Sequence, residues 1–95
     1  MTYAVHVRPR ALRDLDELPA DVRRRVLTRL EALAENPRPQ NAEHLTHPFR
    51  GILRLRIGNY RVSYSIDEKA RVVDVWRAGH RSTFYLRLKG SFLVK

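Results

Sequence analysis

Two alternating segments joined by a two-residue turn constrain the fold of this 95-residue chain most strongly. Residues 52–57 and 60–66 alternate apolar and polar side chains, a period of two that is typical of half-buried β-strands. Only Gly58 and Asn59 stand between them, and both residue types accept the positive φ angles of a tight turn. The sequence therefore predicts an antiparallel β-hairpin.

This turn also fixes the register of the hairpin and the side chains that share a face. The predicted pairs are Ile57 with Tyr60, Arg56 with Arg61, Leu55 with Val62 and Arg54 with Ser63. Alternation then sends one apolar set to a single face: Leu53, Leu55, Ile57, Tyr60, Val62 and Tyr64. The opposite face receives Arg54, Arg56 and Arg61. Because like charges directly opposite each other destabilise a sheet, we expect an anion there, either the carboxylate of Asp74 or the phosphate of a ligand.

Two helices precede the hairpin. The first follows Pro9 and repeats apolar residues at helical spacing up to Leu18, before Pro19 ends it. The second starts with Pro19 and Asp21 in its first turn and ends before Pro37. Its apolar stripe consists of Val22, Val26, Leu30, Leu33 and Ala34. We expect both to pack, as a helical hairpin, on the apolar face of the sheet.

The remaining segments complete an α+β fold. Residues 3–7 and 71–78 read as strands, and Gly79 is expected to break the second of them. Residues 37–49, which hold three prolines, read as a loop, whereas the tail from residue 81 to 95 is ambiguous between a helix and a strand fragment. We therefore predict one domain, residues 1–95, built as a small antiparallel β-sheet with a two-helix hairpin packed on one face.

Positive charge is concentrated in the second half of the chain. Residues 50–95 carry eleven basic and three acidic residues, a net charge of +8, whereas residues 1–49 carry eight and seven. An arginine-rich composition alone would scatter the excess evenly. A basic half on a nearly neutral body instead favours binding to nucleic acid or another polyanion.

The sequence gives little support for a disulfide-bonded, metal-binding, secreted or membrane protein. The absence of cysteine excludes a disulfide framework, a thiolate metal site and a cysteine nucleophile. His44 and His47 lie three residues apart in the proline-containing loop, but no third ligand is evident, so we expect no metal. The first residues do not read as a signal peptide, and no apolar run approaches the length of a membrane span. A cytoplasmic protein with no membrane association is expected.

Several motifs along the chain resemble those of the RelE/ParE toxin superfamily. The segment from Leu53 to Tyr64, LRLRIGNYRVSY, resembles the superfamily's core motif RxGxYRvxY. The segment Ala78-Gly79-His80-Arg81, with Tyr85 after it, resembles the following vgHR…vY segment. Leu18-Pro19 before the second helix and Asn36-Pro37 after it match the Lp…nP pattern of the superfamily. The resemblance covers nearly the whole chain and implies a single RelE-like toxin domain.

Resemblance to the RelE branch implies a ribosome-dependent endoribonuclease, an mRNA interferase. Such a toxin inhibits translation by cutting messenger RNA in the ribosomal A site without a metal, through attack of a ribose 2′-hydroxyl on the adjacent phosphate. The implied catalytic positions are Ile52, Arg54, Arg61, Arg81 and Tyr85. Arg54 and Arg61 would grip the scissile phosphate, a role that suits the planar guanidinium. Arg81 would lie beside the leaving oxygen.

The general base is left open between His80 and Tyr85. The best-known RelE toxin has lysines at the positions of Ile52 and Arg54, so Ile52 removes one candidate base or charge stabiliser. Arginine and tyrosine side chains ordinarily hold their protons at pH 7, whereas histidine titrates near 6.5. His80 could equally be a turn residue bonded to the backbone, and Tyr85 could be buried in the packing of the tail.

Further RNA-binding residues are expected from the basic half: Arg50, Arg56, Arg77 and Lys89. Arg23, Arg24, Arg25 and Arg29 are expected to form a solvated helix face, with ribosomal RNA as the alternative partner. Tyr60, Tyr64 and Trp76 are expected in the core. No cofactor, metal or small-molecule ligand is implied.

The resemblance also implies partners and leaves two rival functions. The implied partners are the ribosome with its messenger RNA and a cognate acidic antitoxin encoded by a neighbouring gene. One rival is a ParE-like DNA gyrase poison without nuclease chemistry, against which the combination of Arg61, His80, Arg81 and Tyr85 argues. The other rival is a degenerate member that still binds its antitoxin but no longer cuts, which Ile52 favours.

Overall fold

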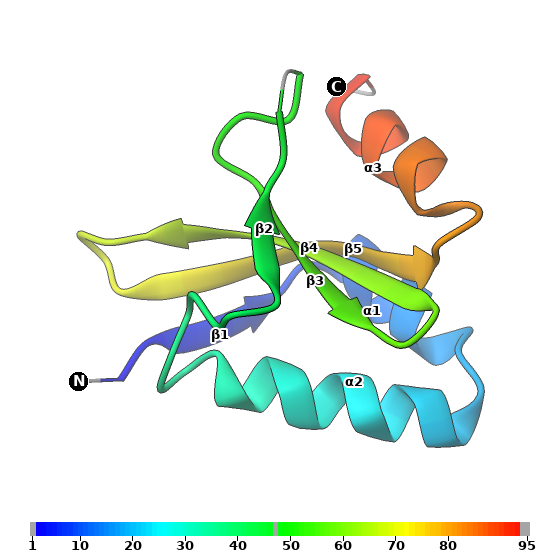
Figure 1. Cartoon of the computed structure of the whole chain (residues 1–95), viewed down its shortest axis with the longest axis horizontal. Helices are drawn as coiled ribbons and strands as arrows, with labels where there is room; N and C mark the ends of the chain where they lie inside the picture. The colour runs from blue at the N-terminus through cyan, green and yellow to red at the C-terminus, as the bar shows by residue number, and fades with distance from the viewer. Residues whose placement is uncertain (1, 47, 94–95) are drawn as a thin grey trace.

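The computed structural model describes residues 2–46 and 48–93, and over this range the chain forms one five-stranded sheet and three helices (Figure 1). In chain order the elements are β1 (Ala4–Val7), α1 (Pro9–Asp16), α2 (Ala20–Ala32), β2 (Ala42–His44), β3 (Leu53–Ile57), β4 (Tyr60–Asp67), β5 (Val72–His80) and α3 (Phe84–Leu93). The strands lie in the order β1-β5-β4-β3-β2. The predicted α+β class is thus correct.

The β3–β4 hairpin has the predicted register. Ile57 pairs with Tyr60 and Arg56 with Arg61, and the pairing continues to Leu53 and Tyr64. Gly58 has a φ of 59°, the left-handed conformation that the two-residue turn requires and that glycine adopts without steric cost. The face assignment of the apolar side chains is confirmed as well, because Leu53, Leu55, Ile57, Val62 and Tyr64 are all buried in one core.

The prediction of a purely antiparallel sheet is wrong. β1 pairs with β5 in parallel, with Ala4 beside Val72 and Val7 beside Val75. Both helices and the β3–β4 hairpin lie between these two strands in the sequence, so no local turn could reveal their pairing. A connection of this length allows the chain to return to the same end of the sheet, as parallel pairing requires.

Two further boundaries differ from prediction. The expected loop at residues 37–49 contains β2, a three-residue edge strand in which His44 pairs with Leu53. β2 is too short and too polar to show alternation. β5 is not broken by Gly79 but runs on to His80, because β4 offers pairing partners for both residues. The ambiguous tail forms α3 over its described residues.

Helices α1 and α2 share the main core with one face of the sheet. Ala11, Leu15, Val22, Val26 and Leu30 are nearly inaccessible and pack in one cluster with the buried strand residues. Fully burying one such aliphatic side chain contributes about 1.5–3 kcal/mol. The Tyr64 hydroxyl donates a 2.7 Å hydrogen bond to the carbonyl oxygen of Pro37, which ties the segment after α2 to β4.

Helix α3 lies on the opposite side of the sheet from α2 (Figure 1). Phe84 and Leu88, one turn apart, are fully buried, and α3 contacts β4 and β5. The open part of this face carries Trp76, which is half-buried beneath the guanidinium of Arg8, rather than lying in the core as predicted. Of the other aromatic residues expected in the core, Tyr64 is fully buried and Tyr60 packs at its border.

Candidate nucleic-acid interface

Four arginines and a tyrosine surround the turn-proximal half of the β3–β4 hairpin. We call Arg54, Arg56, Arg61, Arg81 and Tyr85 the basic face. Alternation along β3 gives Arg54 and Arg56 the same side, and pairing puts Arg61 opposite Arg56. The backbone N–H of Arg81 donates to the carbonyl oxygen of Asn59 at 2.8 Å, which fixes the chain after β5 against the hairpin turn.

Arg54 is the most firmly held member of the basic face. One terminal nitrogen, Nη1, donates to the hydroxyl of Tyr85, and the other, Nη2, lies 2.9 Å from Oε2 of Glu43 on β2. Its Nε is buried without an acceptor among the described residues. Since Tyr85 belongs to α3, the contact also confirms that Arg54 faces away from α1 and α2. Glu43, an exposed carboxylate that the sequence reasoning did not consider, partly balances the charge of Arg54.

Arg61 lies at the centre of the uncompensated charge. Its Nη1 donates to the carbonyl oxygens of Gly58 and Tyr60, at 2.9 and 3.0 Å. Partial burial, followed by the positive charges of Arg56, Arg54 and Arg81, lowers the pKa of Arg61. A guanidinium nevertheless stays protonated at neutral pH. A bound anion would therefore relieve the repulsion that these neighbours exert on it.

Carboxylates within the chain do not neutralise the rest of this face. Over the described residues, no salt bridge reaches Arg56, Arg61 or Arg81. The candidate partner Asp74 is engaged elsewhere, at 3.1 Å from Nδ1 of His6 and 3.3 Å from Nε of Arg8. The carboxylate alternative through Asp74 is therefore wrong, and Glu43 takes only Arg54. An external polyanion remains the chemically complementary occupant of the basic face.

His80, the last residue of β5, lies at the edge of the basic face. Its Nδ1 accepts a hydrogen bond from the backbone N–H of Ser82 at 3.2 Å and lies 2.9 Å from the Ser82 hydroxyl. A backbone amide can only donate, so Nδ1 must be unprotonated in this arrangement and the neutral ring carries its proton on Nε2. The ring contacts Tyr60 edge to face, with centroids 5.4 Å apart. Nε2 of His80 is thus a hydrogen-bond donor in this arrangement, and the lone pair of Nδ1 is occupied by Ser82.

Tyr85 is held by its ring while its hydroxyl meets Arg54. The ring centroid lies 5.2 Å from that of Phe84 and 6.5 Å from that of Phe49, and the residue is 43% exposed. The alternative of Tyr85 buried in the packing of the tail is therefore wrong. The phenol combines a hydroxyl beside a guanidinium with an accessible ring on which a base could stack.

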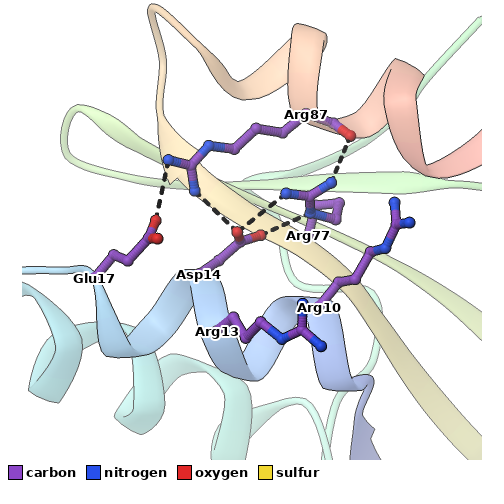
Figure 2. A pocket seen from close by; sticks show the side chains of 6 residues that line it. All are labelled: Arg10, Arg13, Asp14, Glu17, Arg77 and Arg87. Atoms are coloured by element: carbon purple, nitrogen blue, oxygen red, sulfur yellow. Dashed lines mark hydrogen bonds and ion pairs between the residues drawn. The ribbon is translucent and has the colours of Figure 1, made fainter.

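The other predicted RNA-binding residues differ in position. Arg50 is exposed in the loop before β3, and Lys89 is exposed one turn after Tyr85 on α3. Arg77 does not join the basic face, because its guanidinium forms an ion pair with the carboxylate of Asp14 on α1 (Figure 2). Only 14% of the Arg77 side chain is exposed. Ile52 is buried and supplies neither a charge nor a base.

Asp14, Glu17 and Arg87 form a second charged cluster that the sequence reasoning missed. Figure 2 shows these side chains meeting Arg77 between α1, β5 and α3. One signal was available, because Asp14 follows Ala11 by three residues and precedes Leu18 by four, within the buried stripe of the helix. An acidic residue at such a position is rarely buried unless it is paired.

The described residues contain neither a metal-ligand cluster nor a membrane-spanning helix. Within residues 2–46 and 48–93, no three histidine, cysteine, aspartate or glutamate side chains gather closely enough to hold a metal ion, and His47 lies outside the described residues. Over the same part of the chain, the helices are too short or too polar to cross a bilayer.

Several solved structures that share this fold are described as toxins or as toxin–antitoxin complexes. The chain is similar to a chain of the RelBE2 complex of Mycobacterium tuberculosis, with 29% identity and a TM-score of 0.78 over 85% of this chain and 100% of that one. It is similar to a chain of the RelE–RelB complex of Pyrococcus horikoshii, with 29% identity and a TM-score of 0.71 over 85% and 97%. A mutant of the E. coli toxin RelE in the free state shares the fold over the full length of both chains, at 21% identity and a TM-score of 0.77.

The sequence itself defines the family. Residues 5–85 match the family described as the ParE toxin of the type II toxin–antitoxin system parDE. Because this match spans most of the chain, the protein belongs to the ParE toxin family, within the RelE/ParE superfamily. No curated protein sequence matches the chain. The family match thus makes this chain a toxin of this superfamily. Whether it acts as a nuclease or as a gyrase poison must be argued from the residues of the site.

Proposed function

We propose that this protein is a ribosome-dependent endoribonuclease toxin that cleaves messenger RNA in the ribosomal A site and so inhibits translation. The observation that carries the proposal is the contact of Arg54 with Tyr85 beside Arg61 and Arg81, two arginines to which no carboxylate is bonded within the described chain. Anion binding and acid–base chemistry can both occur at such a site. A surface that only bound a protein partner would not need a phenol held on a guanidinium.

The proposed reaction is an internal transfer at phosphorus. The ribose 2′-oxygen forms a bond to the adjacent phosphorus, the bond from phosphorus to the 5′-oxygen breaks, and a 2′,3′-cyclic phosphate and a free 5′-hydroxyl result. The 2′-hydroxyl loses a proton and the leaving oxygen gains one. Arg54 and Arg61 bind the non-bridging oxygens, whose charge grows in the transition state. Arg81 lies beside the leaving oxygen in the same scheme.

Tyr85 is the proposed base, in preference to His80. Arg54 directs a hydrogen bond at the phenolic oxygen, and the phenolate form of Tyr85 would accept the proton of the 2′-hydroxyl. The His80 nitrogen that could accept a proton is occupied by the N–H of Ser82, so we do not assign the role of base to His80. Arg50, Arg56 and Lys89 would add phosphate contacts around this centre. Arg77 is not part of this centre, because its guanidinium binds Asp14.

The proposed partner in the resting cell is an acidic antitoxin encoded beside the toxin gene, with both proteins in the cytoplasm. The similar structures include complexes of RelE toxins with RelB antitoxins. An acidic segment of the antitoxin would cover the basic face and compete with RNA for the same arginines. The complex would therefore be inactive in cleavage.

A gyrase poison is the second candidate function, because the matching family is described by the parDE system. The experiment that separates the two is a pulse of toxin expression with labelled amino acids and labelled thymidine. The proposal predicts that protein synthesis stops first and that DNA synthesis follows. A primary stop in DNA synthesis, with translation intact, would favour the gyrase poison. Antitoxin binding without any growth arrest would favour the degenerate toxin.

A further inference from the structure

The carboxylate of Asp14 joins three separate elements of the fold. On β5, Nε and Nη2 of Arg77 donate to its Oδ2 and Oδ1 at 2.8 and 3.1 Å, and the backbone N–H of Ala78 donates to Oδ2 at 2.9 Å. From α3, Nη1 of Arg87 donates to Oδ1 at 2.9 Å. Asp14 itself lies on α1 and is only 4% exposed. Four donors thus meet two oxygens, which is the full acceptor capacity of a carboxylate.

This cluster binds α3 through both its side chain and its backbone. Nη1 of Arg77 donates to the carbonyl oxygen of Arg87 at 2.8 Å, so the arginine that Asp14 orients also holds the helix backbone. Arg87 makes a further contact with Glu17 at 3.3 Å, where the glutamate is 67% exposed (Figure 2). Buried charge pairs of this kind depend strongly on geometry, and removing one partner is costly. Glu17, in contrast, forms a surface pair of small energetic weight.

The cluster and the basic face hold opposite flanks of the same helix. The buried side chains of Phe84 and Leu88 mark the face of α3 that is turned toward the sheet. At about 100° per residue, Tyr85 projects from one flank and Arg87 from the other. The Tyr85 hydroxyl meets Arg54, while Arg87 meets Asp14. Rotation of α3 about its own axis must therefore break both contacts together.

We propose that Asp14 is a positioning residue: through Arg87 it fixes the rotation of α3 and so holds the Tyr85 hydroxyl on Arg54. The apolar contacts of Phe84 and Leu88 are non-directional and permit small rotations of the helix. The directional hydrogen bonds of Arg87 do not. The catalytic consequence rests on the function proposed above, whereas the positional claim does not.

The positional claim is tested by fluorine NMR on protein labelled with 3-fluorotyrosine. The Tyr85 resonance is assigned by its loss in Tyr85→Phe, and it reports the surroundings of the hydroxyl. Arg87→Gln should shift this resonance and speed amide exchange across residues 84–90. Arg87→Lys, which can still reach Oδ1 with one donor, should restore most of the wild-type spectrum. Glu17→Gln is the matched control, because it removes only the exposed contact, and it should leave the Tyr85 resonance unchanged.

The consequence for cleavage is tested on the same proteins with ribosome-bound messenger RNA. A small misplacement of a reacting group can cost up to about 10²-fold in rate, so we expect Arg87→Gln to lower kcat about 10- to 100-fold with KM nearly unchanged. Asp14→Asn should resemble it if that variant folds, as urea denaturation will show. Arg87→Lys should recover part of kcat.

Each outcome decides one of the two claims. A Tyr85 resonance that is the same in wild type and Arg87→Gln, or that moves as far in Glu17→Gln, would overturn the positioning role. A shifted resonance with undiminished kcat in Arg87→Gln would overturn its catalytic importance. If the wild type cuts no message at all, the proposed function fails, and the fluorine spectra still decide whether the contact of Arg87 with Asp14 positions Tyr85.

Discussion

The guanidinium of Arg54 on β3 donates a hydrogen bond to the hydroxyl of Tyr85 on α3, although 31 positions separate the two residues in the sequence. The sheet holds the arginine rigidly, with 15% of its side chain exposed, and α3 brings the phenol to it. In the proposed function, this contact would join phosphate binding and proton transfer at one point of the surface.

Tyr85→Phe should reduce cleavage severely, by about 10²-fold or more, without unfolding the protein. The substitution keeps the ring contacts with Phe84 and Phe49 and removes only the oxygen that meets Arg54. General base catalysis contributes about 10²–10⁴-fold. Single-turnover cleavage on ribosome complexes measures the effect. A variant that keeps more than half of the wild-type rate would show that the ring, rather than the hydroxyl, matters.

His80→Gln should leave most of the cleavage rate, with a loss of about tenfold at most. The Nδ1 of His80 is occupied by the backbone N–H of Ser82, and a glutamine oxygen can accept the same hydrogen bond. The rate is measured from pH 5.5 to 8.5 for the wild type and the variant. Loss of cleavage at every pH, to the level of Tyr85→Phe, would instead identify His80 as the essential acid–base group.

Tyr64→Phe should lower the free energy of unfolding by about 1–3 kcal/mol at pH 7, because it leaves the buried carbonyl of Pro37 without its donor. Burial raises the pKa of Tyr64 from 10.0 to about 12. A raised folded-state pKa means that the contribution is complete below pH 10 and is lost as pH rises through about 12. Urea denaturation at pH 7 and pH 11 should thus show a smaller difference at pH 11. Tyr60→Phe serves as the control, and a difference independent of pH would contradict the assignment.

The hairpin and its faces followed from the sequence because they depend on local rules. Gly58 and Asn59 set the loop length, the loop length sets the register, and alternation then puts Arg54 and Arg61 on one face. The strand β2 could not be read because three edge residues carry no periodic pattern. The parallel pairing of β1 with β5 joins Val7 to Val75, a contact between distant segments that no turn announces.

The residues of the candidate site also divide into those that the sequence predicts and those that it does not. The arginines of the hairpin were identified because their register is local, and Tyr85 because of the family resemblance. Asp14 was missed because its partners Arg77 and Arg87 lie 63 and 73 positions away, and only the folded chain brings them together. For the same reason the sequence predicts Arg77 as an RNA contact, although its guanidinium binds Asp14. Charge alone does not distinguish an arginine that binds a carboxylate from one that awaits a phosphate.

The association of this toxin with an acidic antitoxin should slow as salt rises, by about tenfold or more between low and high ionic strength. The half of the chain from residue 50 to 95 carries a net charge of +8, and electrostatic steering of this kind is screened by salt. Stopped-flow mixing with the product of the neighbouring gene measures the rate. Arg56→Gln should lower the rate more than Arg24→Gln, since Arg24 lies on α2, on the opposite side of the sheet from α3. A salt-independent rate would contradict the electrostatic part of the proposal.

Primer extension on messenger RNA from translating ribosomes tests the central claim most directly. Purified wild-type protein should produce cuts in ribosome-bound message and none in free message. Arg61→Ala and Arg81→Ala should each lower the cutting by about 10²–10³-fold, since each removes a charged donor aimed at the phosphate, while Arg24→Ala should cut like the wild type. The opposite result would be a wild-type protein that leaves ribosome-bound message intact and instead arrests growth through gyrase.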